Sequence, residues 1–154
     1  MTALPRTLSR SLGTLVAVGA TLALSACGTS DVTAPRLQKA LAPTFANLYV
    51  QRAGILGETG ITTATVAPKA TCDRGGPKVA DVGPGADWIC MISFTDDAGV
   101  RQDGKFEVQA KANSTYTAAG PSKLIGLVMI TDVRTGKDVP NPVFEFDGAF
   151  DPQS

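Results

Sequence analysis

Residues 88–95 read WICMISFT, and this stretch decides the fold class of the chain. Every second side chain in it is apolar: Trp88, Cys90, Ile92 and Phe94. Because alternate side chains of a β-strand point to the same face, the pattern predicts a strand with one buried face. Residues 106–111, FEVQAK, alternate in the same way, and DDAG at 96–99 is typical of a turn. The sequence therefore predicts an antiparallel strand pair whose apolar face needs a covering layer.

The covering layer is predicted from residues 43–56, PTFANLYVQRAGIL. Apolar side chains recur there with the spacing of one helix face: Phe45, Leu48, Tyr49, Ala53 and Leu56. Pro43 is tolerated in the first turn of a helix, and Gly57 is typical of the position after the last turn. Residues 27–42 are expected to form a tether before this helix. Part of the tether has helical spacing of its apolar residues: Leu37, Ala40 and Leu41.

Three further stretches have the composition of β-strands. Residues 61–71 are rich in Thr, Val and Ile, although Pro68 favours an edge strand or a bulge. Residues 124–130 are apolar on both faces, as in a central strand, and residues 143–147 alternate. One helix and four or five antiparallel strands within residues 43–154 predict a single α+β domain, with the helix on one face of the sheet.

A cystatin-like arrangement of these elements is expected by analogy alone. Cystatin inhibitors use a hairpin with the pattern Gln-x-Val-x-Gly. The nearest fragment here is QAKAN at 109–113, which lacks both the valine and the glycine. Protease inhibition is therefore not predicted.

The first 26 residues are predicted to be a signal peptide. Arg6 and Arg10 precede the uncharged residues 12–24, which as a helix would span about 20 Å, short of the ~30 Å core of a bilayer. LSAC at 24–27 then resembles the bacterial lipobox. This predicts a diacylglyceryl group on Cys27, which would anchor the exported protein to the outer face of the cell membrane. The alternative is an ordinary signal peptide that is cleaved after residue 26 and leaves a free thiol.

The other two cysteines, Cys72 and Cys90, are predicted to form a disulfide, because an exported protein meets an oxidising environment. The chain has no CxxC pair and no histidine, so a zinc site or a redox pair is disfavoured. The loop between the two cysteines is rich in Gly and Pro. A disulfide would restrict that loop in the unfolded chain and so stabilise the fold.

Composition excludes several functions. The chain of 154 residues has 14 basic and 14 acidic side chains and no histidine. Without Arg6 and Arg10 of the signal peptide, 12 basic face 14 acidic side chains, which argues against a nucleic-acid partner. The lack of histidine excludes Ser-His-Asp, Cys-His and His-metal chemistry. No catalytic residue and no cofactor are predicted. No metal site is predicted either, because Asp96, Asp97 and Asp103 lack the spacing of a calcium loop and suit a solvated turn.

Two aromatic residues are candidate ligand contacts. Trp88, the one tryptophan, would be a stacking platform at a loop mouth, or it would pack over the disulfide and the core, which the sequence favours. Phe144 and Phe146 share one face of a predicted strand and are expected in the core. Phe150 follows a glycine and suits either the core or an exposed apolar patch.

The segments CDRGG at 72–76, GPGADWIC at 83–90, NP at 141–142 and FDG at 146–148 resemble a group of small actinobacterial lipoproteins to which no activity is attached. These motifs are turns, cysteines and an aromatic residue, so they concern the fold. The resemblance implies a second cysteine pair in that group at the positions of Thr115 and Ala149, which would make these two residues neighbours across two strands. This chain lacks that second disulfide.

The expected function is that of a lipid-anchored, non-enzymatic binding or accessory protein of the cell envelope, with an envelope protein, a lipid or a cell-wall polymer as partner. The alternative is a carboxylate-dependent envelope hydrolase. That alternative needs two of Asp132, Glu145 and Asp147 in one pocket, with one pKa raised. A purely structural subunit would instead have a flat apolar patch and no cavity.

Overall fold

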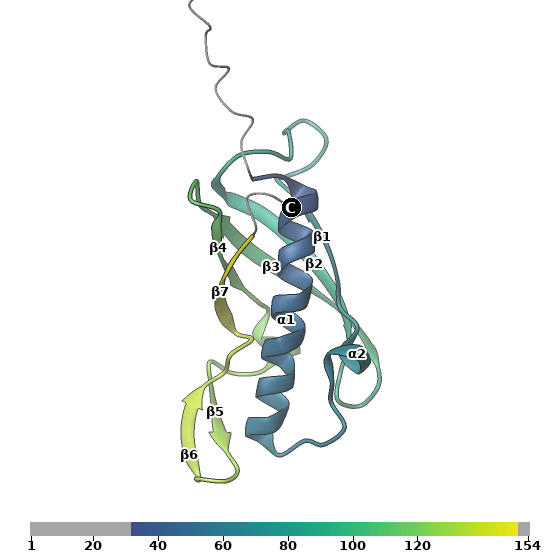
Figure 1. Ribbon diagram of the computed structural model, residues 1–154, viewed down its shortest axis with the longest axis vertical. Helices are drawn as coiled ribbons and strands as arrows, with labels where there is room; N and C mark the ends of the chain where they lie inside the picture. The colour runs from purple at the N-terminus through teal and green to yellow at the C-terminus, as the bar shows by residue number, and fades with distance from the viewer. Residues whose placement is uncertain (1–31, 151–154) are drawn as a thin grey trace, which may run out of the picture.

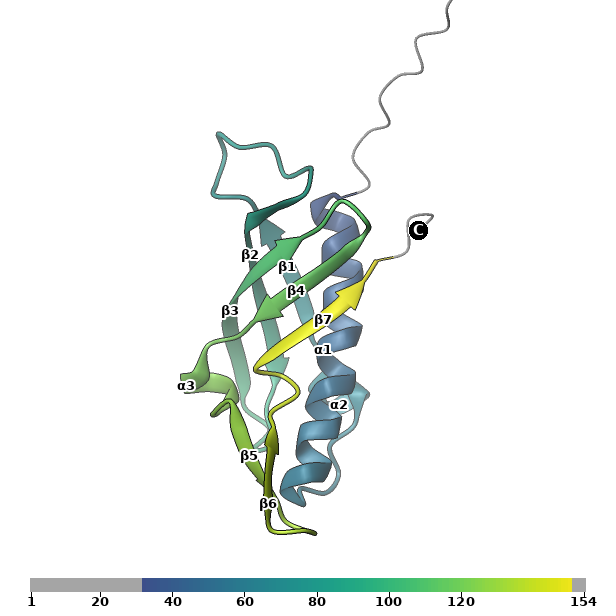
Figure 2. The ribbon, with the colours of Figure 1, turned by 90° about the vertical axis from the view of Figure 1, so that its left-hand side faces the viewer.

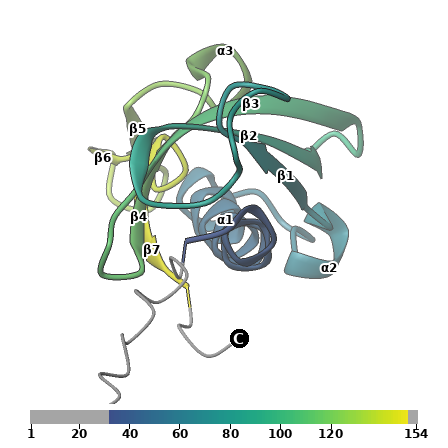
Figure 3. The ribbon, with the colours of Figure 1, turned by 90° about the horizontal axis from the view of Figure 1, so that it is seen from above.

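The computed structural model of the chain describes residues 32–150, and one long helix, α1 (Ala34–Leu56), runs along them (Figure 1). The helix lies on one face of a five-stranded antiparallel sheet with the order β1-β2-β3-β4-β7. The strands are β1 (Lys69–Asp73), β2 (Gly85–Thr95), β3 (Arg101–Ala110), β4 (Thr115–Ala119) and β7 (Glu145–Ala149). Seen along the helix, the sheet curves around it (Figure 3). The predicted α+β class is confirmed.

The core lies between α1 and the concave face of the sheet. Alternate residues of the strands point into it: Trp88, Cys90, Ile92 and Phe94 of β2, Phe106, Val108 and Ala110 of β3, and Tyr116 and Ala118 of β4. Phe45 of α1 packs among their rings, with its ring centroid 4.8 Å from that of Phe94 and 5.5 Å from that of Phe106. The period of two in residues 88–95 therefore reflects burial on one face.

The helix begins earlier than predicted, so residues 34–42 are not a tether. Pro35 occupies the first turn, where a missing amide costs nothing, and Pro43 lies in the middle of the helix. Leu37 and Leu41 are fully buried against the sheet. The domain thus includes Val32, which is also buried, and the predicted start at residue 43 is wrong. The signal peptide, Cys27 and the rest of the tether lie outside the described residues.

The end of α1 is confirmed at Gly57. This glycine has φ 75°, a left-handed conformation that favours glycine, and its amide and that of Glu58 donate to carbonyl groups of the last turn. No helix within residues 32–150 combines the length and the apolar character needed to cross a membrane.

Only part of residues 61–71 forms a strand. Thr62 and Thr65 form a reciprocal capping box that starts the one-turn helix α2 (Thr63–Val66). The prediction of a strand from residue 61 onward is therefore wrong at its start. Pro68 directly precedes the edge strand β1, as its missing amide favours.

The prediction of a central strand at residues 124–130 is also wrong. The short helix α3 (Ser122–Ile125) is followed by a separate hairpin of β5 (Met129–Asp132) and β6 (Lys137–Pro140), beyond one end of the main sheet (Figure 2). Leu127 is 73% exposed and Val128 is 54% exposed. The buried side chain of Asn141 donates to the carbonyl groups of Ile125 and Leu127, which holds the chain in this turn and out of the sheet.

The predicted disulfide is confirmed between Cys72 and Cys90. The two residues are direct partners in the register of β1 and β2, and their Cα atoms are 4.1 Å apart. It joins the edge strand β1 to the interior of the sheet at a position where both side chains are buried.

Candidate functional site

Trp88 is fully buried, so the favoured alternative, packing in the core, is confirmed and the alternative of a ligand contact is wrong. Its indole nitrogen donates to the carbonyl of Gly83 at 3.1 Å, and the Arg74 guanidinium lies 5.7 Å from its ring centroid. The indole is thus covered by the glycine-rich loop that precedes β2. Trp88 anchors this loop to the core and presents no surface to a ligand.

Arg74 organises the same loop. Its amide donates to Asp81, and its guanidinium donates to the carbonyl of Val82 and to the Asp87 carboxylate, with Nη2 to Oδ1 at 2.8 Å. This hydrogen bonding lowers the pKa of Asp87. The loop residues of the quoted motif therefore hold one another and the indole in place, and their role is structural.

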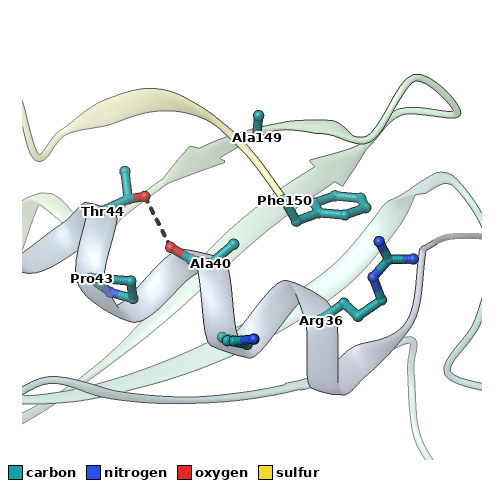
Figure 4. A pocket seen from close by; sticks show the side chains of 7 residues that line it. Arg36, Ala40, Pro43, Thr44, Ala149 and Phe150 are labelled. Carbon is teal, nitrogen blue, oxygen red and sulfur yellow. Dashed lines mark hydrogen bonds between the residues drawn. The ribbon is translucent and has the colours of Figure 1, made fainter. Parts of the chain in front are cut away.

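A groove lies between α1 and the end of β7, with a volume of about 330 Å³ (Figure 4). This volume lies at the lower end of the range of small-molecule sites. Its lining combines residues of the first half of α1 with residues from the end of the domain: Arg36, Lys39, Ala40, Pro43, Thr44, Ala149 and Phe150. Two of the seven lining residues are basic and none is acidic.

The two basic residues lie on the α1 side of the groove together with Ala40 and Pro43, and Phe150 lies on the side of β7. Arg36 and Lys39 are three positions apart on α1 and so lie on neighbouring turns of the same face. The Arg36 guanidinium is 5.9 Å from the ring centroid of Phe150, toward which it extends in Figure 4. This distance allows a cation–π contact.

The hydroxyl groups beside the groove bond to the helix backbone. Pro43 has no amide to donate to the carbonyl of Lys39, and at this point α1 departs from regular helical bonding. The Ala40 carbonyl accepts from Thr44 Oγ1 at 2.9 Å and from Tyr116 Oη at 3.5 Å. These hydroxyl protons are therefore engaged within the protein, and the charged side chains of the lining are those of Arg36 and Lys39.

For Phe150, the sequence left two alternatives open, burial in the core or exposure in an apolar patch. It is 2% exposed, so most of its ring belongs to the core, and it is part of the groove wall. Its amide donates to the Ser114 carbonyl, and its ring stacks on that of Tyr116 at a centroid distance of 6.4 Å. Gly148 permits this arrangement, because a Cβ atom there would overlap the Tyr116 ring. Ligand contact by Phe150 stays a prediction.

The three acidic residues that the hydrolase alternative requires do not lie in one pocket. Asp132 ends β5 and accepts from the amide of Arg134, which lowers its pKa. Asp147 of β7 accepts from Thr117 Oγ1 at 2.6 Å. Glu145 lines a separate depression of about 220 Å³ with Val128, Pro140, Asn141 and Phe144, none of which is acidic. These three carboxylates share no described pocket.

The acidic residues of the predicted turn have structural partners. Asp96 accepts from the amides of Ala98 and Val100 and from the Gln102 side chain, and these bonds lower its pKa. Asp103 accepts from the Ser93 hydroxyl across the strand pair. Within residues 32–150, no group of three or more cysteine or acidic side chains is placed to hold a metal ion.

Sequence analysis missed a carboxylate pair at the far end of α1. Glu58, beyond the helix, and Asp97, in the β2–β3 turn, lie close enough for their side chains to interact. Burial, followed by the charge of Asp97, raises the pKa of Glu58, although Arg52 lies 3.9 Å from its carboxylate. Arg52 also lies 5.2 Å from the ring centroid of Tyr49. These residues are far apart in sequence, and no local motif marks them.

Thr115 and Ala149 are direct partners across β4 and β7. The neighbourhood that the lipoprotein resemblance implies for them is therefore confirmed as a property of this fold. The membership itself is a separate matter: no family model, no curated protein and no solved structure matches the chain. The likeness to actinobacterial lipoproteins and the cystatin-like arrangement both stay predictions.

Proposed function

We propose that the protein is a lipid-anchored, non-enzymatic binding protein of the cell envelope, and that the groove between α1 and β7 is its binding site. The observation that carries the proposal is the lining of this groove, which combines two basic side chains with apolar ones. Ligand sites commonly combine apolar walls with a few polar groups that fix orientation. The lipobox-like LSAC at 24–27 supports export and acylation of Cys27.

The location is tested by fractionation of the host that makes the protein. Cys27→Ala should move the protein from the membrane fraction to the soluble exported fraction, because no acyl chains can attach. Ser30→Ala is the matched control and should stay with the membrane. Retention of Cys27→Ala in the membrane would contradict lipid anchoring.

The binding role is tested by native mass spectrometry of the protein isolated from its own envelope. An added mass that survives gentle purification, and that is lost in Arg36→Gln/Lys39→Gln, supports a ligand in the groove. A bare polypeptide mass in both forms contradicts the binding proposal and favours a structural subunit.

A carboxylate-dependent hydrolase is the second candidate, and the observation that favours it is the Glu58–Asp97 pair. A paired carboxylate with a raised pKa is a known arrangement for acid catalysis. Isolated cell walls incubated with the protein should then release new reducing ends, and Glu58→Gln should abolish the release. An equal absence of release with wild type and variant favours the binding role.

A further inference from the structure

We infer that the groove receives an extended segment of an envelope protein, which adds a strand to the free edge of β7 and carries basic side chains at alternate positions. This inference rests on the proposed function, since it takes the groove between α1 and β7 as the binding site. In strand addition, main-chain hydrogen bonds provide affinity, and the side chains at alternate positions provide specificity.

The outer edge of β7 has main-chain groups that no neighbouring strand takes up. The amide of Phe150 donates to the carbonyl of Ser114, so these two residues are a hydrogen-bonded pair. Because such pairs alternate with non-hydrogen-bonded pairs, every second residue of β7 directs its amide and carbonyl away from β4. These residues are Glu145, Asp147 and Ala149. β7 is the last strand of the main sheet, and no strand within residues 32–150 pairs with it on that side.

Other strand edges of the domain are less open. The carbonyl of Cys72 in β1 accepts from the side chain of Gln38 in α1 at 3.5 Å. In the hairpin, Pro140 leaves β6 without one amide. Side-chain contacts and prolines of this kind limit the pairing of an edge strand with another chain. β7 has no proline, and its register with β4 has no bulge, so its edge is suited to strand addition.

The groove lies directly beside this edge. The side chain of Ala149 is exposed and points away from α1 in Figure 4, so β7 borders the groove there with its main chain. Figure 3 shows β7 at the margin of the curved sheet beside α1, with no helix or strand beyond it. An added strand would therefore continue the sheet past β7 and over the groove, and every second side chain of it would point toward the helix.

The two faces of the added strand would meet different surfaces. On the outer face, its side chains would lie opposite the exposed carboxylates of Glu145 and Asp147, which favours lysine or arginine there. Asp147 also accepts from Thr117 Oγ1, which holds its carboxylate on that face. On the inner face, the intervening side chains would point toward Ala40 and Pro43, which favours small apolar ones. Basic and apolar residues therefore alternate in the segment that fits.

A second copy of the chain fits this edge less well. In the antiparallel register that pairs the whole of β7 with β7 of another copy, Asp147 would lie opposite Asp147. Like charges directly opposite each other destabilise a strand pair. Charge complementarity thus favours a different protein with basic side chains.

The first test separates strand addition from charge attraction. Residues 27–154 with Cys27→Ala, which keep all of residues 32–150, are titrated with a short capped peptide of alternating lysine and valine. N-methylation of the lysine amides removes the donors that would face β7 and should abolish binding. N-methylation of the valine amides keeps those donors and the same charges, and that peptide should still bind. Equal binding of the two methylated peptides would overturn the inference.

The second test removes the acidic side chains. Glu145→Gln/Asp147→Asn should weaken binding of the unmethylated peptide about 2- to 30-fold, the range for two cross-strand pairs of opposite charge. The matched control is Asp103→Asn/Glu107→Gln, with the same charge change on the exposed face of β3, and it should bind like the parent. An equal loss of binding in the control would show general charge attraction and would contradict the inference.

The third test removes one outward amide of β7. Ala149→Pro keeps the hydrogen bonds to β4 and should weaken peptide binding several-fold, because proline is tolerated on an edge strand but cannot donate. Ala149→Val keeps the amide and is the matched control. Equal binding by the two variants would overturn the inference, as would a dimer of the chain that the peptide cannot dissociate. If native mass spectrometry finds a small molecule in the groove, the proposed function stands and this inference fails.

Discussion

Thr115 and Ala149 face each other across β4 and β7 as a non-hydrogen-bonded pair. Phe150 donates its amide to the Ser114 carbonyl, so residues 114 and 150 form a hydrogen-bonded pair and the next pair along is of the other kind. Cα atoms in such pairs are about 4.5 Å apart, within the range of disulfides. Cys72 and Cys90, at 4.1 Å, are also direct cross-strand partners.

Thr115→Cys/Ala149→Cys should therefore form a disulfide without rearrangement of the sheet. In the chain-entropy model, closing this loop stabilises the protein by about 3–4 kcal/mol. The melting temperature under oxidising conditions should rise, and reductant should reverse the rise. Thr115→Cys/Asp147→Cys, displaced by two residues, is the control and should leave two free thiols, because diagonal partners are about 7–8 Å apart. An absence of the bond in the first variant would contradict the register of β4 and β7.

Loss of the native disulfide should destabilise the fold. Cys72→Ala/Cys90→Ala removes a cross-link between residues 18 positions apart, which is worth about 3 kcal/mol in the same model. The melting temperature should fall by roughly 10 °C, as measured by circular dichroism. Reduced wild type is the control and should melt near the variant. An unchanged melting temperature in both would mean that the bond does not stabilise the fold.

Because α1 starts at residue 34, truncation of two leucines should lower the free energy of unfolding by different amounts. Leu41 is fully buried in α1, and Leu41→Ala should lower the free energy of unfolding by about 2–5 kcal/mol. Leu127, in the turn before β5, is 73% exposed, and Leu127→Ala should change the same quantity by no more than about 0.5 kcal/mol. Urea denaturation measures both. Similar costs for the two variants would contradict the placement of residues 34–42 in the core.

The pair of Glu58 and Asp97 predicts a pH dependence of stability. Burial and then Asp97 raise the pKa of Glu58 above its ordinary value of 4.5, so the folded chain holds the proton more tightly than the unfolded chain. The free energy of unfolding should therefore fall as pH rises through the window from about 4.5 to the raised pKa. Above that window, Glu58→Gln should be more stable than wild type, because the neutral amide removes the repulsion.

Denaturation of Glu58→Gln and wild type at several pH values measures this dependence. Glu107→Gln, on the exposed face of β3, is the matched control and should keep the slope of the wild type. A Glu58→Gln protein that is less stable than wild type at neutral pH would show that the ion pair with Arg52 outweighs the repulsion.

Local patterns predicted the elements whose residues are neighbours in sequence. The alternation in residues 88–95, the turn at 96–99 and the stop at Gly57 each depend on a few adjacent residues, and all three are confirmed. The prediction of a strand at residues 124–130 was wrong because a continuous apolar run has no period that distinguishes a strand from a turn. The path of this segment depends on Asn141, whose side chain donates to the carbonyl groups of Ile125 and Leu127 from 16 and 14 positions away in the sequence. A local pattern cannot include such a distant residue.

The helix start and the groove were harder to predict for different reasons. Leu37 and Leu41 gave a helical signal, but small residues around them and Pro43 favoured a break. The groove has no sequence signal at all, because Arg36 and Phe150 come from opposite ends of the domain and meet only through the position of β7 beside α1. Phe150 was named as a candidate contact, whereas Arg36 and Lys39 were not.

The native disulfide makes the two edge strands of the sheet, β1 and β7, differ in how they are attached to their neighbours. β1 is covalently joined to β2, so its amides exchange with solvent only through larger openings of the fold. β7 is held to β4 by hydrogen bonds and by the packing of Phe146 and Phe150, with no disulfide between the two strands, and its end lies beside the groove. The edge strand beside the groove is therefore the one that has no covalent link to its neighbour within the described residues.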